Sequence, residues 1–199
     1  IIVFEGIEGS GKSYHINNVA KYLKSKRIKF IKIREPGGSK SSEKIRKLIL
    51  NNKSTFNKNT DLLLYLSARS ENIDLIKKNN EKKIILIDRF VDSTIAYQHY
   101  GMGVNINLIQ SINSFLLKKI KVNFTFLNLV NKKNMKERLA QRKKLNRYDK
   151  FSAIFYKKVQ EGFLKILNKN PKNYMKIDSN LNILENKKKI LNKIDHLIK

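Results

Sequence analysis

The segment from Gly6 to Ser13, Gly-Ile-Glu-Gly-Ser-Gly-Lys-Ser, contains the residues of this chain best suited to chemistry. It matches the phosphate-loop pattern, in which two glycines five positions apart are followed by Lys and Ser. The glycines let the backbone curl so that successive N–H groups point into one concavity, where phosphate oxygens bind. Lys12 would reach the terminal phosphates of a nucleotide, and the Ser13 hydroxyl would hold Mg²⁺.

Strand and helix signals flank this loop in the order that a phosphate loop requires. Upstream, Ile1–Phe4 is an apolar, β-branched run typical of a buried parallel strand. Downstream, from Ser13 to about Lys26, apolar residues recur at helical spacing. This helix would add its positive dipole end to the loop. The alternative, a glycine-rich turn that binds nothing, is disfavoured by this context.

A second candidate for chemistry is Asp88, which ends the apolar run Ile84–Ile87. A carboxylate at the end of a strand beside a phosphate loop can orient Mg²⁺ or its waters, as in a Walker B strand. A strand-end Asp is also a common cap or turn residue, so this residue alone leaves both interpretations open. Arg89, the next residue, can clamp a second phosphate in a bidentate manner.

The positions of arginine are informative because lysine dominates the basic residues. The chain of 199 residues has 43 Lys and Arg against 16 Asp and Glu, a formal charge of +27. Lysine occurs along the whole chain, so we expect solvated basic faces rather than a specific nucleic-acid site. Arginine is expected where a planar, bidentate donor matters. Seven arginines fall in segments with other signals: Arg34, Arg46, Arg69, Arg89, Arg138, Arg142 and Arg147.

Further strands and helices alternate along the chain. Strands are predicted at 29–33, 82–90, 122–130 and 174–178, and helices at 43–50, 61–76, 106–117, 151–167 and 183–197. The alternation predicts an α/β fold with a five-stranded parallel sheet flanked by helices. We expect a single domain over residues 1–199. No apolar run is long enough to cross a membrane, and the absence of cysteine fits a cytoplasmic protein.

Polar residues recur where the predicted strands give way to loops and helices. Arg34–Ser39 is a Pro- and Gly-rich loop, either a ligand loop or an ordinary turn. Tyr65 and Arg69 are four apart and share one side of a helix. The segment 92–100 carries side chains able to hydrogen-bond the edge of a base, namely Ser93, Tyr97 and Gln98.

The basic stretch 136–150 contains three arginines and almost no core residues. Arg138 and Arg142 are four apart, which on a helix places them on one face, where like charges repel. The repulsion is tolerable if an anion binds between them. A solvated basic helix is the alternative, and the sequence leaves the two open.

Taken together, these segments resemble the bacterial thymidylate kinase family, which phosphorylates dTMP with ATP. The motifs that carry the resemblance are Phe4–Ser13, Arg34-Glu35-Pro36-Gly37-Gly38, Tyr65–Arg69, Asp88-Arg89-Phe90, Ser93–Gln98 and Arg138–Arg147. The resemblance implies a three-layer P-loop kinase fold and a role in dTTP synthesis. It also implies Mg²⁺ and a homodimer, whose interface apolar residues of helices 62–76 and 106–117 would supply. ATP would bind at Gly6, Ile7, Glu8, Gly9, Ser10, Gly11, Lys12 and Ser13.

The resemblance further implies roles for single residues. Arg89 inherits the contact with the dTMP phosphate, while Phe90 lacks the hydroxyl of the family's tyrosine. Tyr65 matches an aromatic that stacks on thymine, Arg69 an arginine that faces the base, and Glu8 a carboxylate near the sugar 3′-hydroxyl and the metal. The implied dTMP set is Glu8, Pro36, Arg46, Tyr65, Arg69, Arg89, Ser93, Tyr97 and Gln98, with Ser13 and Asp88 at Mg²⁺, directly or through water.

Members of the family differ in whether the arginine near the transferring phosphoryl group lies in the phosphate loop or in a lid. Position 9 is glycine here, so the chain resembles the lid-arginine type, with a lid at about 136–150. Lys143 and Asn146 stand where Gly and Asp are common in the family. The implied catalytic set is Lys12, Arg89, Glu8, Arg142 and Arg147, the last two being equal candidates for the main lid arginine.

Three other functions compete with this interpretation. Another nucleoside monophosphate or deoxynucleoside kinase would share the phosphate loop and differ in base selectivity. A GTPase is disfavoured because Asn131-Lys132-Lys133-Asn134 has Asn where guanine recognition requires Asp. A basic nucleic-acid-binding P-loop protein would bind duplexes in a salt-sensitive manner without turnover.

Overall fold

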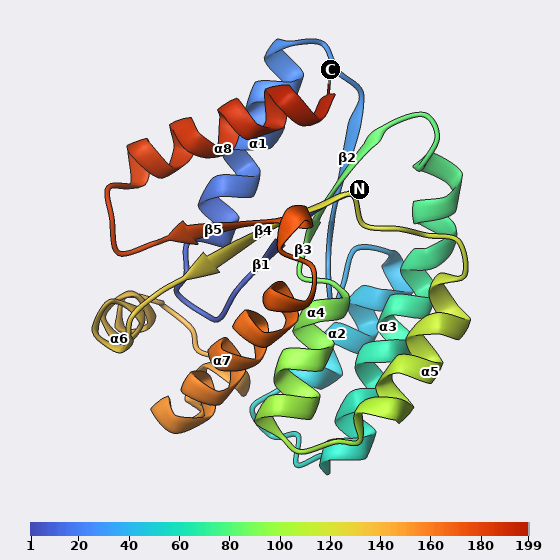
Figure 1. The fold of residues 1–199 in the computed structure, drawn as a ribbon. Coiled ribbons are helices and arrows are strands. Elements are labelled where there is room, and N and C mark those ends of the chain that lie inside the picture. Colours follow the sequence, from blue (N-terminus) through green and yellow to red (C-terminus); the bar gives the residue numbers. More distant parts are fainter. Residues whose placement is uncertain (199) are drawn as a thin grey trace.

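The computed structural model describes residues 1–198 and contains a five-stranded parallel sheet (Figure 1). The strand order is β2-β3-β1-β4-β5, and all neighbours are parallel. The strands are β1 (Ile2–Glu5), β2 (Phe30–Arg34), β3 (Ile84–Asp88), β4 (Phe124–Leu129) and β5 (Tyr174–Asp178). The predicted fold class is confirmed, and β1, which leads into the phosphate loop, is the central strand.

Helices cover both faces of the sheet, so the molecule has three layers (Figure 1). One face carries α1 (Lys12–Ser25) and α8 (Ile183–Ile198). The other carries α2 (Lys40–Leu50), α3 (Lys58–Asn79), α4 (Val91–Thr94), α5 (Ile106–Leu117) and α7 (Ala153–Lys169). Within residues 1–198, no helix has the length and apolar character needed to cross a membrane.

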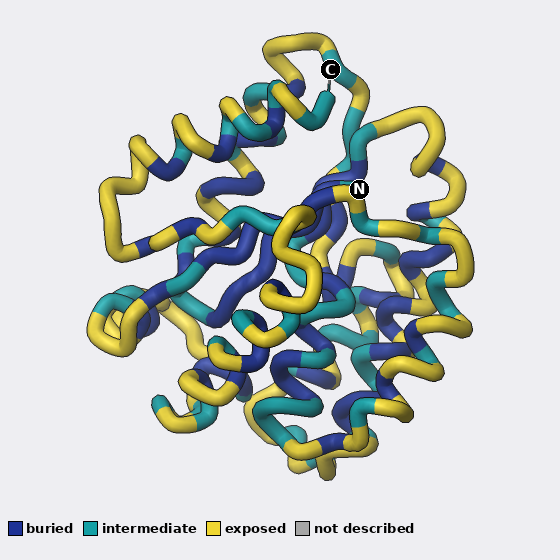
Figure 2. The backbone as a smooth tube through the Cα atoms, in the orientation of Figure 1, coloured by how far each residue is buried: buried dark blue, intermediate teal, exposed yellow. Residues whose placement is uncertain are grey.

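The central strand supplies core residues to both layers. Ile2 and Phe4 pack with Ile16 of α1, whereas Val3 packs on the opposite side with Ile76 of α3. Successive side chains of a strand point to opposite faces, and a strand covered on both faces reads as a continuous apolar run. Figure 2 shows the result: the three central strands are largely buried, whereas the edge strands β2 and β5 and the outer sides of the helices are partly exposed.

Two helices begin three residues before the apolar periodicity predicts. α2 begins at Lys40 because Ser39 caps it, its side chain accepting the N–H of Ser42. α3 begins at Lys58 because the Asn57 side chain accepts two N–H groups of the first turn. Capping residues therefore set both starts, and apolar residues join the helices only after the first turn.

The segment after β3 packs closely on α7. It consists of α4 followed by the π-helical segment Ile95–Gly101. A Cβ on Gly101 would lie 2.7 Å from the ring of Phe155, and a Cβ on Gly162 would lie 2.6 Å from the ring of Tyr100. Only glycine at these two positions lets the segment 92–101 and α7 come so close. The close packing fixes the position of the polar residues of 92–100 relative to α7.

The lid segment differs from the prediction. α6 (Lys132–Ala140) ends before Arg142, so the prediction that Arg138 and Arg142 share one face of a helix is wrong. Beyond α6 the chain turns toward α2, where the N–H of Arg147 donates to the carbonyl of Leu50 (3.4 Å). Such tertiary contacts override helix propensity. The stretch also contains a core residue, because Tyr148 is buried.

Candidate active site

The phosphate loop lies between β1 and α1, as the sequence predicts. Gly6, Gly9 and Gly11 have φ values of 136°, 70° and 80°, which residues with a Cβ rarely adopt. A Cβ on Gly6 would also lie 2.2 Å from the carbonyl oxygen of Asn128 on β4. The loop thus brings the backbone to the N-terminus of α1 in a form suited to phosphate oxygens.

Lys12 is turned onto the loop that precedes it. Its Nζ donates to the carbonyl oxygens of Gly6 and Ile7, each at 2.9 Å. Burial, together with the neighbouring Arg89, lowers the pKa of Lys12 to about 8. A phosphate oxygen offers Nζ the same acceptor chemistry with a negative charge, so it can replace these carbonyls.

Ser13 and Asp88 meet at the edge of the loop. The parallel register of β1 and β3 pairs Phe4 with Asp88, and Ser13 Oγ lies 3.5 Å from Asp88 Oδ2. A hydroxyl and a carboxylate are the hard oxygen ligands that Mg²⁺ accepts beside substrate phosphates. No cluster of three or more His, Cys, Asp or Glu suited to a metal occurs within residues 1–198. The pair fits a Mg²⁺ ion that takes its other ligands from phosphate and water.

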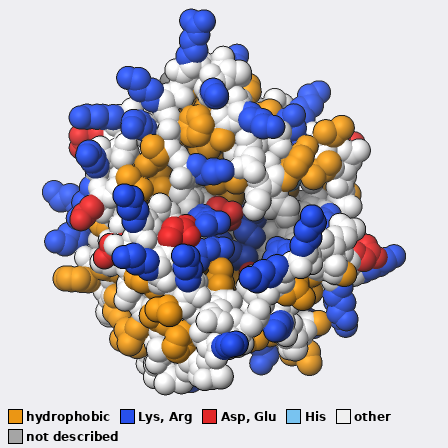
Figure 3. Space-filling view, turned by 180° about the vertical axis from the view of Figure 1, so that it is seen from behind, with side chains coloured by type: hydrophobic (Ala, Val, Ile, Leu, Met, Phe, Trp, Pro, Cys, Tyr) orange, Lys and Arg blue, Asp and Glu red, His pale blue; other side chains and the backbone are white. Residues whose placement is uncertain are grey.

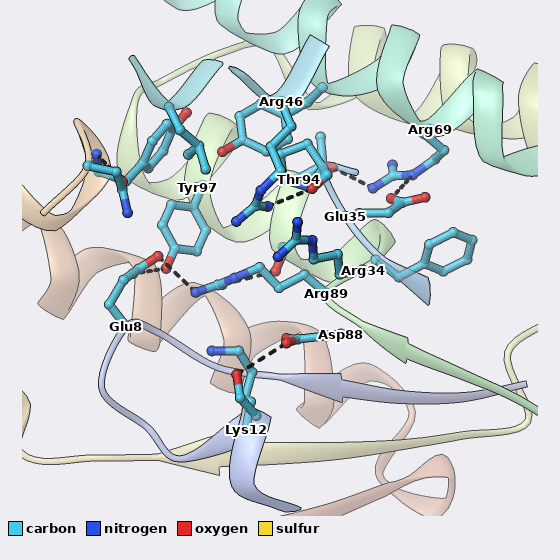
Figure 4. Close-up of a pocket in the computed structure, with 18 of the residues that line it drawn as sticks. Glu8, Lys12, Arg34, Glu35, Arg46, Arg69, Asp88, Arg89, Thr94 and Tyr97 are labelled. Carbon is cyan, nitrogen blue, oxygen red and sulfur yellow. Dashed lines mark hydrogen bonds and ion pairs between the residues drawn. The ribbon is translucent and has the colours of Figure 1, made fainter. Parts of the chain in front are cut away.

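Arg89 joins the phosphate loop to the cleft beside it (Figure 4). Its guanidinium donates to the Gly6 carbonyl (2.8 Å), to Glu8 (2.8 Å) and to Ser93 Oγ (3.3 Å), and it lies 5.1 Å from the ring centroid of Tyr97. Tyr97 also donates to Glu8. Burial alone would raise the pKa of Glu8, but Arg89 and Lys12 outweigh it, and the pKa is lowered. Glu8 therefore remains ionised beside two cations.

The Pro- and Gly-rich loop after β2 forms one wall of the cleft. Pro36 lines it, and its carbonyl accepts a bond of 2.6 Å from Arg46 of α2. Arg34 also lines the cleft, but it pairs with Glu43 at 3.0 Å in an exposed position. The two arginines thus add positive charge to the side of the cleft opposite the phosphate loop.

Arg69 is buried in the cleft wall and held by three elements. It donates to Glu35 (2.8 Å), Asn113 of α5 (2.6 Å) and Thr94 (2.9 Å), and its guanidinium lies 5.1 Å from the Phe90 ring centroid. Burial raises the pKa of Glu35 despite the pairing with Arg69. Phe90 therefore supports an arginine by its ring face, a contact that needs no hydroxyl.

The remaining predicted dTMP residues also lie in the cleft. Tyr65 packs edge-on against Tyr148, with ring centroids 5.7 Å apart. Gln98 donates to the Tyr148 hydroxyl (3.2 Å), while its Oε1 has no partner among the described residues. The cleft gathers all nine predicted positions: Glu8, Pro36, Arg46, Tyr65, Arg69, Arg89, Ser93, Tyr97 and Gln98.

The three arginines of the lid segment occupy different environments. Arg138 donates to the carbonyls of Gly9 (2.9 Å) and Ser179 (2.6 Å). Arg142 lines the cleft and pairs with Asp149 at 2.5 Å. Arg147 is not among the described residues that line the cleft, and it pairs with Asp61. The structure thus separates Arg142 and Arg147, which the sequence left equivalent.

Sequence reasoning missed several residues of the site. Glu35, Thr94 and Tyr148 line the cleft but were not among the predicted site positions. Glu5, at the end of β1, is fully buried and accepts bonds from the turn after β3. One signal was available for Glu5, because an acid that ends an apolar strand beside the phosphate loop resembles Asp88. Thr94 follows the predicted Ser93 directly.

A phosphate loop that opens into an arginine-lined cleft, on a parallel sheet of this order, defines a P-loop kinase for a small phosphorylated substrate. Comparison with known proteins narrows this class. The family whose description is thymidylate kinase matches residues 4–190. The chain belongs to the thymidylate kinase family, whose members are phosphotransferases.

Individual relatives agree with this assignment. The thymidylate kinase of Thermosipho africanus is 39% identical over 184 residues, covering 92% of this chain and 90% of the relative. The thymidylate kinase of Sulfurihydrogenibium sp. is 39% identical over 187 residues, covering 92% and 91%. The crystal structure of thymidylate kinase from Ehrlichia chaffeensis aligns with a TM-score of 0.78 at 30% identity, covering 98% of this chain and 97% of that one.

Proposed function

We propose that this chain transfers the γ-phosphoryl group of ATP to dTMP, giving dTDP and ADP. The observation that carries the proposal is the position of Arg89, which contacts Gly6 and Glu8 of the phosphate loop and lines the cleft with Tyr65 and Arg69. An arginine at this junction can hold the acceptor phosphate in line with the donor. Such positioning accounts for much of phosphoryl-transfer catalysis.

On the donor side, the loop Gly6–Ser13 would bind the phosphates of ATP. Lys12 Nζ would leave the carbonyls of Gly6 and Ile7 for a phosphate oxygen, which satisfies the buried ammonium with a charged acceptor. Ser13 and Asp88 would hold Mg²⁺, which when bound neutralises phosphate charge.

On the acceptor side, dTMP would lie in the cleft with its phosphate at Arg89, assisted by Arg46. Thymine would stack on Tyr65 and receive hydrogen bonds from Arg69. The guanidinium of Arg69 has five N–H donors in all, and three of them are used in bonds to the cleft wall. Glu8 and Tyr97 would face the sugar, with Ser93 and Gln98 beside the nucleoside. The acceptor needs no general base, because a nucleotide phosphate is already an anion.

The lid at about 136–150 would close over the transferring group. We assign Arg142 as the principal lid arginine, because it lines the cleft. Arg147 would instead hold the lid to the rest of the molecule, since it donates to the Ile49 carbonyl (3.1 Å) and pairs with Asp61. With Arg142 in this role, the chain would be of the lid-arginine type. Closure would exclude water and limit wasteful hydrolysis of ATP.

The assembly and location of the protein complete the proposal. Residues 1–199 would act as one kinase domain in the cytoplasm, as a homodimer. Leu63 of α3 and Phe115 of α5 support the dimer, since they are 53% and 72% exposed on the two helices where an apolar interface is expected. Lys and Arg are spread over the face seen in Figure 3, which supports ligand recognition in the cleft rather than along a basic stripe.

ADP release tests the proposal. Purified protein with Mg²⁺-ATP would be assayed separately with dTMP, dUMP, dCMP, dGMP and AMP, with Lys12→Ala alongside. We expect strong preference for dTMP and loss of turnover in the variant. Preference for another nucleotide would favour a different nucleoside monophosphate or deoxynucleoside kinase. Turnover in Lys12→Ala within a few-fold of the wild type would contradict the mechanism.

A further inference from the structure

Arg89 has a backbone conformation that residues with a side chain seldom adopt. Its φ is 68°, in the left-handed region that favours glycine. Non-glycine residues keep such angles only where their surroundings impose them. The backbone around Arg89 must therefore be held by specific contacts, and the direction of its guanidinium depends on them.

The end of β1 supplies those contacts. The N–H of Arg89 donates to the carbonyl of Phe4 at 3.0 Å. The next N–H, that of Phe90, donates to the side chain of Glu5 at 2.7 Å. Consecutive residues of β1 thus bind the peptide groups on both sides of the left-handed residue.

Glu5 also binds the first turn of α4. Its Oε1 accepts the N–H of Ser93 (3.2 Å) as well as that of Phe90, and its Oε2 accepts the Ser93 hydroxyl (2.5 Å). Ser93 Oγ in turn accepts a bond from the Arg89 guanidinium (3.3 Å). Glu5 is therefore linked to Arg89 twice, through the backbone of the turn and through a hydroxyl.

We infer that Glu5 is a positioning residue for the acceptor phosphate: it holds the left-handed turn at Arg89 and so aims the guanidinium into the cleft. Glu5 is fully buried, so it acts through Arg89 rather than on a substrate. The inference rests on the proposed contact of Arg89 with the dTMP phosphate. Its consequence is a defect in dTMP use that spares ATP.

Two substitutions separate the hydrogen bonds of Glu5 from its charge. Glu5→Ala leaves the N–H groups of Phe90 and Ser93 without an acceptor. Glu5→Gln keeps an oxygen for both N–H groups, and its NH₂ can donate to Ser93 Oγ. We expect Glu5→Ala to raise the KM for dTMP at least tenfold with the KM for ATP within threefold of the wild type, and Glu5→Gln to restore the KM for dTMP to within threefold.

A double-mutant cycle with Arg89→Ala tests whether Glu5 acts through Arg89. In the Arg89→Ala background, adding Glu5→Ala is expected to change the KM for dTMP less than twofold. Ile194→Ala, a cavity variant beneath α8, controls for general destabilisation and should leave both KM values unchanged. Where Glu5→Ala does not fold, Glu5→Asp, whose shorter side chain retracts the acceptor, replaces it in the cycle under the same criterion.

The outcomes distinguish this inference from the proposed function. A large defect in Arg89→Ala with a normal KM for dTMP in Glu5→Ala would overturn the inference alone. Additive defects in the double variant, or equal rises in both KM values, would overturn it too. A normal KM for dTMP in Arg89→Ala would remove the proposed role of Arg89, and the inference with it.

Discussion

Asp61 of α3, which is buried, and Arg147 of the lid, which is largely buried, form an ion pair across 86 positions of the chain. Asp61 also accepts the hydroxyl of Tyr148, and Arg147 lies 5.7 Å from the ring centroid of Phe56. Asp61 precedes Tyr65 by one helical turn on the same side of α3. The anchor of the lid and the proposed thymine-stacking residue therefore share one helix face.

Removing Asp61 is expected to release the lid. Asp61→Ala leaves Arg147 and the Tyr148 hydroxyl without their partner, and the loss of one member of a buried ion pair costs about 3 kcal/mol. We expect that decrease in the free energy of urea unfolding and faster tryptic cleavage at Lys143 or Lys144. Glu161→Ala, in the exposed pair with Lys157, is the control and should cost less than about 1 kcal/mol. Equal effects of Asp61→Ala and Glu161→Ala on unfolding and on tryptic cleavage would refute the role of Asp61 as the anchor of the lid.

Alanine substitutions of the two lid arginines are expected to affect different properties, kcat for Arg142 and stability for Arg147. Arg142→Ala should lower kcat about 100-fold or more, the usual cost of removing a group that stabilises transition-state charge. Its loss of stability should be smaller than that of Arg147→Ala, because Arg142 is partly exposed and the buried Asp149 keeps its two bonds from Asn146. Lys144→Ala removes a neighbouring exposed charge and should leave kcat within twofold. A normal kcat in Arg142→Ala would exclude it as the lid arginine.

Arg147→Ala should instead lower stability, because it breaks the buried pair with Asp61. We expect the midpoint of thermal unfolding to fall and kcat to decrease less than in Arg142→Ala, since Arg147 does not line the cleft among the described residues. Parallel measurement of kcat and unfolding for the two variants decides the assignment. A larger loss of kcat in Arg147→Ala, at unchanged stability, would reverse it.

The sequence predicted what depends on neighbouring residues. β1, the loop Gly6–Ser13 and α1 adjoin in the chain, so apolar spacing and glycine positions located them. Asp88 and Arg89 were found because they end an apolar run. The predicted dTMP residues line one cleft because the carboxyl ends of the parallel strands, and the loops that follow them, meet at one edge of the sheet.

What the sequence could not predict depends on pairing between distant segments. Nothing near Arg147 indicates that Asp61 is its partner. Nor does the local sequence indicate that the chain leaves α6 before Arg142 and reaches α2 at Arg147. Glu5 acts on the turn at Phe90 only because β1 and β3 are neighbours. Local patterns identify the side chains, and tertiary structure decides what each one contacts.

The three hydrogen bonds of the Arg69 guanidinium are expected to matter for both stability and dTMP binding. Arg69→Lys keeps the charge but loses the planar donors to Glu35, Asn113 and Thr94. Leaving buried acceptors unsatisfied should lower the free energy of unfolding by about 2 kcal/mol, and the KM for dTMP should rise more than that for ATP. Arg27→Lys, at an exposed arginine, should stay within about 0.5 kcal/mol. An unchanged KM for dTMP in Arg69→Lys would argue against a role at the base.

The carboxyl of Glu5 should give the wild type a pH dependence of stability that Glu5→Gln lacks. Burial, and then the charge of Asp92, raise the pKa of Glu5 to about 7, against bonds from Ser93 and Phe90 and the charge of Arg89, which lower it. The ordinary value is 4.5. Between these two values the native state holds a proton that the unfolded state has lost, so the free energy of unfolding falls as the pH rises.

Glutamine has no proton to lose, so the stability of Glu5→Gln relative to the wild type should increase from pH 5 to pH 8. The expected gain is on the order of 2 kcal/mol, since one pKa unit corresponds to about 1.4 kcal/mol. Urea unfolding of both proteins at several pH values measures it. Glu161→Gln, at an exposed position, should show a constant difference from the wild type. A constant or falling difference for Glu5→Gln would mean that burial of the Glu5 carboxyl does not limit stability near neutral pH.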